Sequence, residues 1–327
     1  MKILRLSLLL ALLGVLPLGA TAGSSLSFQG NGVGQIDRVK ILVDDPATAL
    51  PGPPADVGAT DFTLELWLRG RAAENPAAAV VCGDNDNWIF GHVVLDRDRF
   101  SARPKFGLSI AGNKLVFGIT GADGFDKRTF CSTSTVLDSH WHHVAVTRRR
   151  SDGFVRLFVD GALQASGDGP DGDLSYADDD LPSAPGEPWC PVGVPGVCEE
   201  SDPFLVLGAE KHDAGSTFPS FAGRIDEVRL STTERYTAPF SRPAAPFVAD
   251  GATAALYTLD EGSGDVVGDS SGAVGGPSPG VRAFGGSPAG PWWSGFTPFG
   301  NRDGFELGDL REWDVAVDSS SASVAEP

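Results

Sequence analysis

The chain has 327 residues, with 25 Lys and Arg against 43 Asp and Glu, which gives a formal net charge of −18. Such an acidic chain releases no counterions from DNA or RNA and is repelled by anionic membranes, so nucleic-acid binding is not expected. Hydrophobic residues make up 41% of the sequence, enough to fill a core and to exclude disorder over most of the chain. The 42 Gly and 24 Pro residues favour many turns between short strands over a helix bundle.

The first 22 residues have the pattern of a secretory signal peptide. Lys2 and Arg5 precede an apolar stretch over residues 6–18, which is too short to span a bilayer comfortably, and Ala20-Thr21-Ala22 fits a cleavage site. An uncleaved N-terminal membrane anchor is the alternative. We expect removal of residues 1–22, a mature chain without a membrane span, and a location outside the cell or on its surface.

Four cysteines, an even number, indicate two disulfides in an exported chain. Three pairings of the four are possible. Cys190 and Cys198 flank a Pro- and Gly-rich turn, so a local bridge is expected there, and Cys82–Cys131 would then join two strands. A zinc site is the alternative, but the chain has no C-x-x-C pair and the spacings do not suit zinc.

Short apolar segments separated by turn residues follow one another from Leu26 to about Leu230. In residues 62–68, apolar side chains alternate with Thr63, Glu65 and Trp67, which is the period of a β-strand. Regularly spaced short strands of this kind predict an all-β sandwich or barrel. The expected strands cover residues 62–68, 88–95, 106–110, 115–119, 141–147, 154–159, 162–165, 204–207 and 225–230, with a hairpin turn at Asp160-Gly161.

Three stretches interrupt this pattern. Residues 167–203 have no periodicity and carry several Asp residues, which indicates a long inserted acidic loop that is either solvated or captures calcium. Residues 241–300 are rich in Gly, Ser and Pro around one strand-like run, and we expect them to pack as an extension on the preceding domain. Residues 301–327 form a C-terminal tail that is expected to be partly disordered.

Four ordered motifs resemble those of the LamG-like jelly rolls, the concanavalin A-like group that includes laminin G and pentraxin domains. They are Trp141-His142-His143-Val144-Ala145-Val146, Val155-Arg156-Leu157-Phe158-Val159, Phe204-Leu205-Val206-Leu207-Gly208 and Gly223-Arg224-Ile225-Asp226-Glu227-Val228. The resemblance defines a domain over residues 23–240 and implies a jelly-roll β-sandwich of two antiparallel sheets. It says little about the ligand, because one fold serves many functions.

The resemblance also implies calcium. In pentraxin-like members, an Asp-Asn pair and an acidic run after Leu-Gly hold calcium together, which carries over to Asp84, Asn85, Glu210 and Asp213 as candidate ligands. Their side chains supply the oxygen atoms that calcium prefers. However, Lys211 and His212 stand where further oxygen ligands are expected, and an ordinary turn is the alternative for residues 84–87.

A second ion is implied at Asp226. In many concanavalin A-like domains, an Asp of the last strand holds a structural ion together with backbone oxygens of the first strand, which here would come from Gly30 and Asn31. Gln29 stands where the family often has Asp, which departs from this pattern. A salt bridge or a backbone cap is the alternative role for Asp226.

Patterns that would indicate catalysis are not met. Glycoside hydrolases of this fold need two carboxylates that face each other across the sugar. Glu65 is alone on its strand, and Asp226 and Glu227 are adjacent and face apart, as do His142 and His143. The sequence also lacks protease, phosphate-loop and dinucleotide motifs, so we expect a protein that is not an enzyme.

The sequence therefore predicts a secreted, non-catalytic module that binds an extracellular glycan or protein with the help of calcium. Trp88 and Phe218 are the expected ligand contacts, because aromatic rings stack on sugar faces. Core packing is the alternative for Trp88, since Trp is highly buried on average. Two other functions stay open: a structural component of the cell surface, and a glycan-cleaving enzyme with a facing pair of carboxylates.

Overall fold

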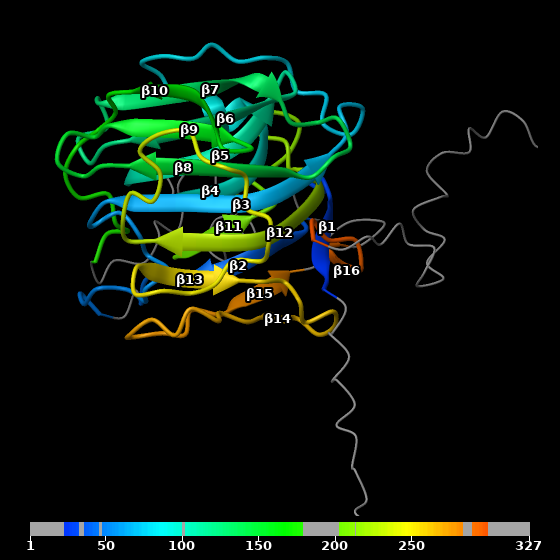
Figure 1. Ribbon diagram of the computed structural model, residues 1–327. Coiled ribbons are helices and arrows are strands. Elements are labelled where there is room, and N and C mark those ends of the chain that lie inside the picture. Colours follow the sequence, from blue (N-terminus) through cyan, green and yellow to red (C-terminus); the bar gives the residue numbers. More distant parts are fainter. Residues whose placement is uncertain are drawn as a thin grey trace, which may run out of the picture.

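Two antiparallel β-sheets stacked face to face form the body of the protein in a computed structural model (Figure 1). The structure describes residues 23–32, 36–45, 48–99, 102–178, 203–212, 214–283 and 290–299. Each sheet has eight strands, and the described residues include one short 3-10 helix, η1 (Asn87–Phe90). The jelly-roll β-sandwich predicted from the sequence is therefore confirmed.

Sheet A has the strand order β10-β9-β8-β3-β12-β1-β16, and β13 also pairs with β12. Its strands are β10 (Ala162–Gly167), β9 (Val155–Val159), β8 (His142–Arg148), β3 (Phe62–Gly70), β12 (Ala222–Ser231), β1 (Ser25–Gln29), β16 (Trp292–Ser294) and β13 (Thr253–Tyr257). Sheet B has the order β14-β15-β2-β11-β4-β5-β6-β7. Its strands are β14 (Val266–Val267), β15 (Gly280–Ala283), β2 (Arg38–Leu42), β11 (Phe204–Leu207), β4 (His92–Arg99), β5 (Ala102–Ala111), β6 (Lys114–Thr120) and β7 (Lys127–Thr135).

The core lies between the two sheets, as the alternation in residues 62–68 predicts. The apolar side chains at alternate positions of β3 are at most 1% exposed and join one hydrophobic cluster with both sheets. The opposite face of β3 is also buried, with Glu65 1% and Trp67 2% exposed. This happens because the chain after β12 returns across sheet A, where Tyr236 and Phe247 contact residues of its outer face.

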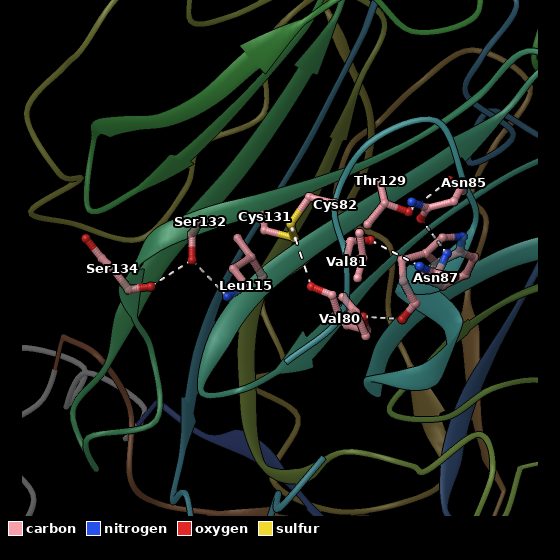
Figure 2. Close-up of a disulfide and its surroundings, with 12 residues drawn as sticks. Val80, Val81, Cys82, Asn85, Asn87, Leu115, Thr129, Cys131, Ser132 and Ser134 are labelled. Carbon is pink, nitrogen blue, oxygen red and sulfur yellow. Dashed lines mark hydrogen bonds between the residues drawn. A yellow bond between two sulfur atoms is a disulfide. The ribbon is translucent and has the colours of Figure 1, made fainter. Parts of the chain in front are cut away.

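A loop before β4 covers the outer face of sheet B. Gly83 exchanges two backbone hydrogen bonds with Thr129 of β7, at 2.9 and 2.8 Å, and the predicted disulfide Cys82–Cys131 is formed beside them (Figure 2). The loop is thus held to β7 by a covalent bond and by backbone pairing. From there η1 lies over β5 and β6.

The Gly-, Ser- and Pro-rich segment 241–300 contributes strands to both sheets instead of packing outside them. β13 pairs with β12 and β16 with β1 in sheet A, while β15 pairs with β2 in sheet B (yellow to orange in Figure 1). β13 coincides with the strand-like run expected in this segment. The sequence hides the other strands because they are short; β14, for example, has two residues.

Several sequence predictions fall outside the described residues. They concern the signal peptide over residues 1–22, most of the acidic loop 167–203, Cys190, Cys198, Asp213 and the tail 301–327. Within the described part of the acidic loop, Leu174 and Tyr176 are buried in the main core. In the part of the chain that the structure describes, no helix has the length and apolar character needed to cross a membrane.

Candidate functional site

A cleft of about 400 Å³ opens at one end of sheet A, where β3 ends, β12 begins and β1 and β16 run side by side. Its lining combines cationic, aromatic and small polar side chains. They include Arg69, Arg71, Arg224, Ser27, Trp292 and Trp293. We call this feature the arginine cleft.

The pairing of four strands places the main residues of the arginine cleft in one row. Arg69 of β3 lies opposite Arg224 of β12, Arg224 lies opposite Ser27 of β1, and Ser27 lies opposite Trp292 of β16. Residues directly opposite each other in antiparallel strands share one face of the sheet, with Cβ atoms about 5 Å apart. Two guanidinium groups, a hydroxyl and an indole therefore project together from the outer face of sheet A.

Neighbouring groups hold the two guanidinium groups in position. The Arg69 Nε donates to the Ser139 carbonyl oxygen at 2.6 Å, and the Arg224 Nε donates to the Ser294 hydroxyl at 3.1 Å. Both guanidiniums lie over the ring of Phe296, with their central carbons 4.3 and 5.5 Å from its centroid. Stacking of this kind orients a guanidinium plane.

A second hollow of about 350 Å³ adjoins the arginine cleft, since Gln29 and Glu74 line both. Beside it, the predicted contact residue Phe218 stacks on Phe90 of η1, with ring centroids 5.8 Å apart. Phe90 is 47% exposed and Phe218 is partly exposed. The structure thus places Phe218 at a surface aromatic pair near the cleft, where a ligand can reach it.

The structure corrects the role expected for Trp88. Its side chain is 0% exposed and packs over Gly107 of β5 and Gly118 of β6, where missing side chains leave room for the indole. A ligand cannot reach this ring. Trp88 is a core residue that anchors the loop on sheet B.

The predicted calcium ligands Asp84 and Asn85 do not meet Glu210. The Asp84 carboxylate is paired with Arg128 of β7, and the Asn85 side-chain oxygen accepts the Asn87 N–H at 3.0 Å. Glu210 lies instead over β4, which is separated from β7 by β5 and β6. Three strand spacings amount to about 14 Å, too far for one ion. The prediction of a shared site was wrong because the loop around Asp84 is tied to β7.

Glu210 belongs to a buried group with Asp98 and His212, whose ligand atoms all lie within 4.8 Å of one another. Calcium takes six to eight oxygen ligands. This group offers an imidazole nitrogen, and the ammonium of Lys211 lies 3.9 Å from the Asp98 carboxylate. The residues present therefore do not fit calcium.

Asp226 is buried, at 2% exposed, beside a bulge in β12. Burial, reinforced by the charges of Glu227 and Asp260, raises the pKa of Asp226 to about 10. The expected backbone partners are not next to it: Leu26 pairs with Ile225, whereas Gly30 lies against Ala222. The start of β1, and not residues 30–31, is therefore nearest to Asp226.

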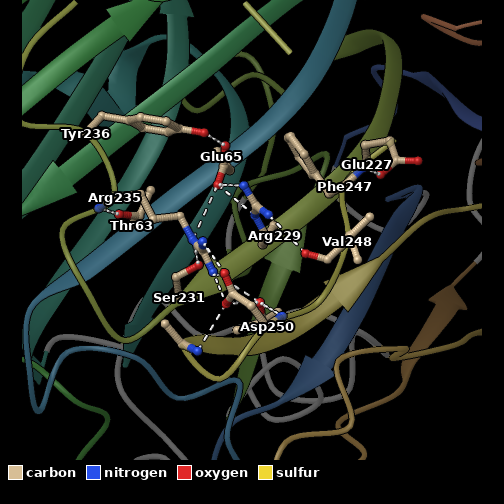
Figure 3. A network of polar contacts seen from close by, with 12 residues as sticks. Thr63, Glu65, Glu227, Arg229, Ser231, Arg235, Tyr236, Phe247, Val248 and Asp250 are labelled. Carbon is tan, nitrogen blue, oxygen red and sulfur yellow. Dashed lines mark hydrogen bonds and ion pairs between the residues drawn. The ribbon is translucent and has the colours of Figure 1, made fainter. Parts of the chain in front are cut away.

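Glu65 lies on the outer face of sheet A, where the chain that returns after β12 covers it (Figure 3). Its carboxylate accepts hydrogen bonds from Arg229 and Tyr236, both at 2.8 Å. It also accepts one from His143 at 3.1 Å. Burial would raise the pKa of Glu65, but the hydrogen bond from His143 and the charge of Arg229 outweigh it and lower that pKa. Glu65 is thus an ionised, fully partnered group that ties the returning chain to β3, out of reach of substrate.

Sequence reasoning missed the arginine cleft. Arg69 has the same parity as Thr63, Glu65 and Trp67, so its outward direction could be read from the alternation. That Arg69, Arg224 and Trp292 form one row depends on strand pairings between distant segments, which no local pattern reveals.

Residues 44–189 match the family model of the concanavalin A-like lectin/glucanases superfamily, within the laminin G type. Together with the two-sheet jelly roll, this match supports a LamG-like jelly-roll domain.

Three of the solved structures that are similar to this chain have TM-scores below 0.5. A candidate carbohydrate-binding protein of Bacteroides ovatus is 15% identical, with a TM-score of 0.49, over 84% of this chain and 60% of that protein. Domains LG4-5 of the mouse laminin α1 chain are 14% identical, with a TM-score of 0.40, over 69% of this chain and 46% of theirs. A pentraxin of Limulus polyphemus is 10% identical, with a TM-score of 0.37, over 72% of this chain and 94% of its own. No curated protein sequence matches this chain significantly.

Proposed function

We propose that this protein is a secreted, non-catalytic module that binds an extracellular glycan bearing carboxylate or sulfate groups in the arginine cleft. The observation that carries the proposal is the row formed by Arg69, Arg224, Ser27 and Trp292 on four neighbouring strands. Guanidinium groups bind carboxylate or sulfate in a bidentate manner, and an indole offers a face for a sugar ring. The matching family model describes a superfamily of lectins and glucanases, and this supports a sugar ligand.

The charge of the cleft supports an anionic ligand. The chain as a whole carries a net charge of −18, yet three arginines line this one cleft. The one carboxylate among its lining residues, Glu74, lies 3.6 Å from Arg71 at the rim. A local cluster of cations attracts an anionic ligand that the rest of the surface repels.

The same lining supports binding without catalysis. Hydrolysis of a glycosidic bond on this fold uses two carboxylates placed about 5–10 Å apart across the sugar. Glu74 is the single carboxylate among the described residues that line the arginine cleft. Within this described lining, a glycan would meet no second acid to complete the pair.

Calorimetric titration tests this function. The mature protein is titrated with a uronate-bearing or sulfated oligosaccharide and with a neutral oligosaccharide of the same length. We expect measurable binding of the acidic ligand alone, weakened by added salt because screening shortens charge interactions. Arg224→Gln should weaken binding at least ~10-fold, the effect of losing one charged hydrogen bond of about 1.5–3 kcal/mol.

Arg149→Gln is the matched control, since Arg149 is an arginine that pairs with Asp152 at 2.6 Å and does not line the cleft. It should bind the acidic oligosaccharide like the wild type. Equal affinity for both oligosaccharides, or an unchanged affinity in Arg224→Gln, would contradict the proposal. Binding of a protein ligand alone would support the adhesive alternative.

Calcium stays a prediction, and Asp226 is the place where we expect it. The carboxylates of Glu227 and Asp260 lie near enough to raise the pKa of Asp226 by their charge. A hard divalent cation among these oxygens would relieve that repulsion.

A further inference from the structure

The segment that follows β11 folds back over the outer face of β4 and buries charged side chains there. Gly208 still donates to the Val94 carbonyl at 2.8 Å, and Lys211 N–H then donates to the Asp96 carboxylate at 3.2 Å. Glu210 and His212, each 1% exposed, are placed above β4 in this way. Asp98 of β4, 7% exposed, faces them.

The donor atoms of this group are spaced like ligands of a common ion. His212 Nδ1 lies 3.4 Å from Asp98 Oδ1 and 3.5 Å from Glu210 Oε1. Hydrogen bonds between such atoms are normally 2.7–3.2 Å long. Two ligands of a tetrahedral ion with bonds of 2.0–2.1 Å lie about 3.3 Å apart.

The Asp98 carboxylate provides a second, independent observation. Its Oδ1 is buried and has no hydrogen-bond partner among the described residues, although it faces His212. A buried carboxylate oxygen without a hydrogen bond is energetically costly. An ion between Asp98, Glu210 and His212 would supply the missing partner.

We infer that Asp98, Glu210 and His212 form a buried site for a divalent transition-metal ion, with Zn²⁺ as the best match. An imidazole nitrogen with carboxylate oxygens suits Zn²⁺, whereas calcium takes oxygen ligands only. The ion clamps residues 210–212 to β4. This inference does not rest on the proposed glycan binding, because the three ligands lie outside the arginine cleft.

The ammonium of Lys211 is an alternative positive charge that would neutralise the carboxylates in place of a metal ion. Its ammonium lies 3.9 Å from Asp98 Oδ1, but it is held by the carbonyl oxygens of Asp98 and Phe204 at 2.5 and 2.6 Å. These two carbonyls direct its hydrogen bonds to the backbone. If Lys211 alone neutralised the carboxylates, the cluster would need no metal, and the experiment distinguishes these two cases.

Elemental analysis and thermal unfolding test the site on the untagged mature chain. We expect one equivalent of Zn²⁺ after dialysis against trace metal, and a rise in the unfolding temperature when ZnCl₂ is added to chelator-stripped protein. His212→Gln should weaken Zn²⁺ binding at least ~10-fold and abolish that rise. His140→Gln is the matched control, because His140 has an 80% exposed side chain outside the cluster, and it should behave like the wild type.

Asp98→Asn is the second variant, in case His212→Gln fails to fold, and it should lose Zn²⁺ in the same way. Co²⁺ should give an absorption spectrum typical of tetrahedral coordination in the wild type but not in Asp98→Asn. Absence of bound Zn²⁺ together with no thermal response would overturn the inference and leave Lys211 as the neutralising group. A thermal response that is equally large with CaCl₂ would also overturn it.

Discussion

The indole of Trp88 lies directly against the backbone of Gly118, at the place where any other residue would carry its Cβ atom. Gly107 on the neighbouring strand β5 leaves room for the far side of the same ring. Two glycines on adjacent strands thus form a slot in the outer face of sheet B. The loop that carries Trp88 can seat on this sheet only because both positions lack a side chain.

Gly118→Ala should therefore destabilise the protein by about 1–3 kcal/mol, the usual effect of overpacking a well-filled site. Gly251→Ala is the control, since no atom lies within 4 Å of a Cβ added there. Urea unfolding of both variants measures the difference. Equal stability of Gly118→Ala and Gly251→Ala would show that the loop can leave the sheet without penalty.

The disulfide Cys82–Cys131 bonds the same loop covalently to β7 and should stabilise the folded protein. It links residues 49 positions apart, so its removal by Cys82→Ser with Cys131→Ser should lower the free energy of unfolding by about 4 kcal/mol.

A second disulfide between Cys190 and Cys198 stays a prediction from the sequence. Alkylation of the non-reduced, unfolded protein followed by mass spectrometry should label no thiol if both bridges form, and two thiols if Cys190 and Cys198 are free.

Loss of the Glu65 charge should strongly destabilise sheet A. Glu65→Gln leaves Arg229 buried without its carboxylate and presents an amide N–H₂ to the donors of Tyr236 and His143. We expect a loss of about 3–5 kcal/mol, which is typical of breaking a buried ion pair. Tyr236→Phe removes one donor from the same carboxylate and should lower stability by only about 1 kcal/mol. Chemical unfolding that gave similar losses for both would argue against an ionised Glu65.

Calcium bound at Asp226 should stabilise the folded protein. Because the pKa of Asp226 is raised to about 10, ionisation of this group destabilises the folded state as the pH rises above its unfolded value of about 4. At pH 8 in chelator, Asp226→Asn should therefore unfold at a higher temperature than the wild type. Calcium should stabilise the wild type and leave Asp226→Asn unchanged. If Asp226→Asn is still stabilised by calcium, the ion binds at another place in the protein.

His142 should make stability depend on pH near neutrality. Burial would lower the pKa of His142, but hydrogen bonds to Asp160 and Asp138 and the charges of both carboxylates outweigh it and raise that pKa. The stabilisation is complete below the unfolded pKa of about 6.5 and is lost as the pH rises through the folded pKa. The stability difference between wild type and His142→Asn should therefore be larger at pH 5.5 than at pH 9. His140→Asn serves as the control.

Local patterns in the sequence predicted many of the strands and a hairpin turn, but they missed β2 and β7 and placed residues 88–90 in a strand, where the structure has η1. The alternation around Glu65 and the Asp160-Gly161 turn both appear where a period of two and turn chemistry place them. The order of the strands across each sheet could not be predicted from such patterns. Asp84 and Glu210 were expected to meet, yet two strands lie between the elements that hold them.

The burial of Trp88 and the position of Arg224 illustrate the same limit. Trp88 is buried by glycines on two other strands, and nothing in its own neighbourhood distinguishes it from an exposed ring. Arg224 reaches a cleft whose other wall comes from Trp292, near the end of the described chain. Such sites are defined by register between distant segments, which a single sequence does not specify.

The position of β1 between β12 and β16 has a consequence for synthesis of the chain. The Ser25 hydroxyl donates to the carbonyl oxygen of Phe296, a residue 271 positions later. A polypeptide that leaves the ribosome or a translocon residue by residue presents β1 first, its neighbour β12 only at residues 222–231, and its neighbour β16 last among the described strands. Until β12 emerges, both edges of β1 are open to aberrant pairing. The first strand must therefore stay unpaired, or be shielded by a chaperone, until most of the domain has emerged.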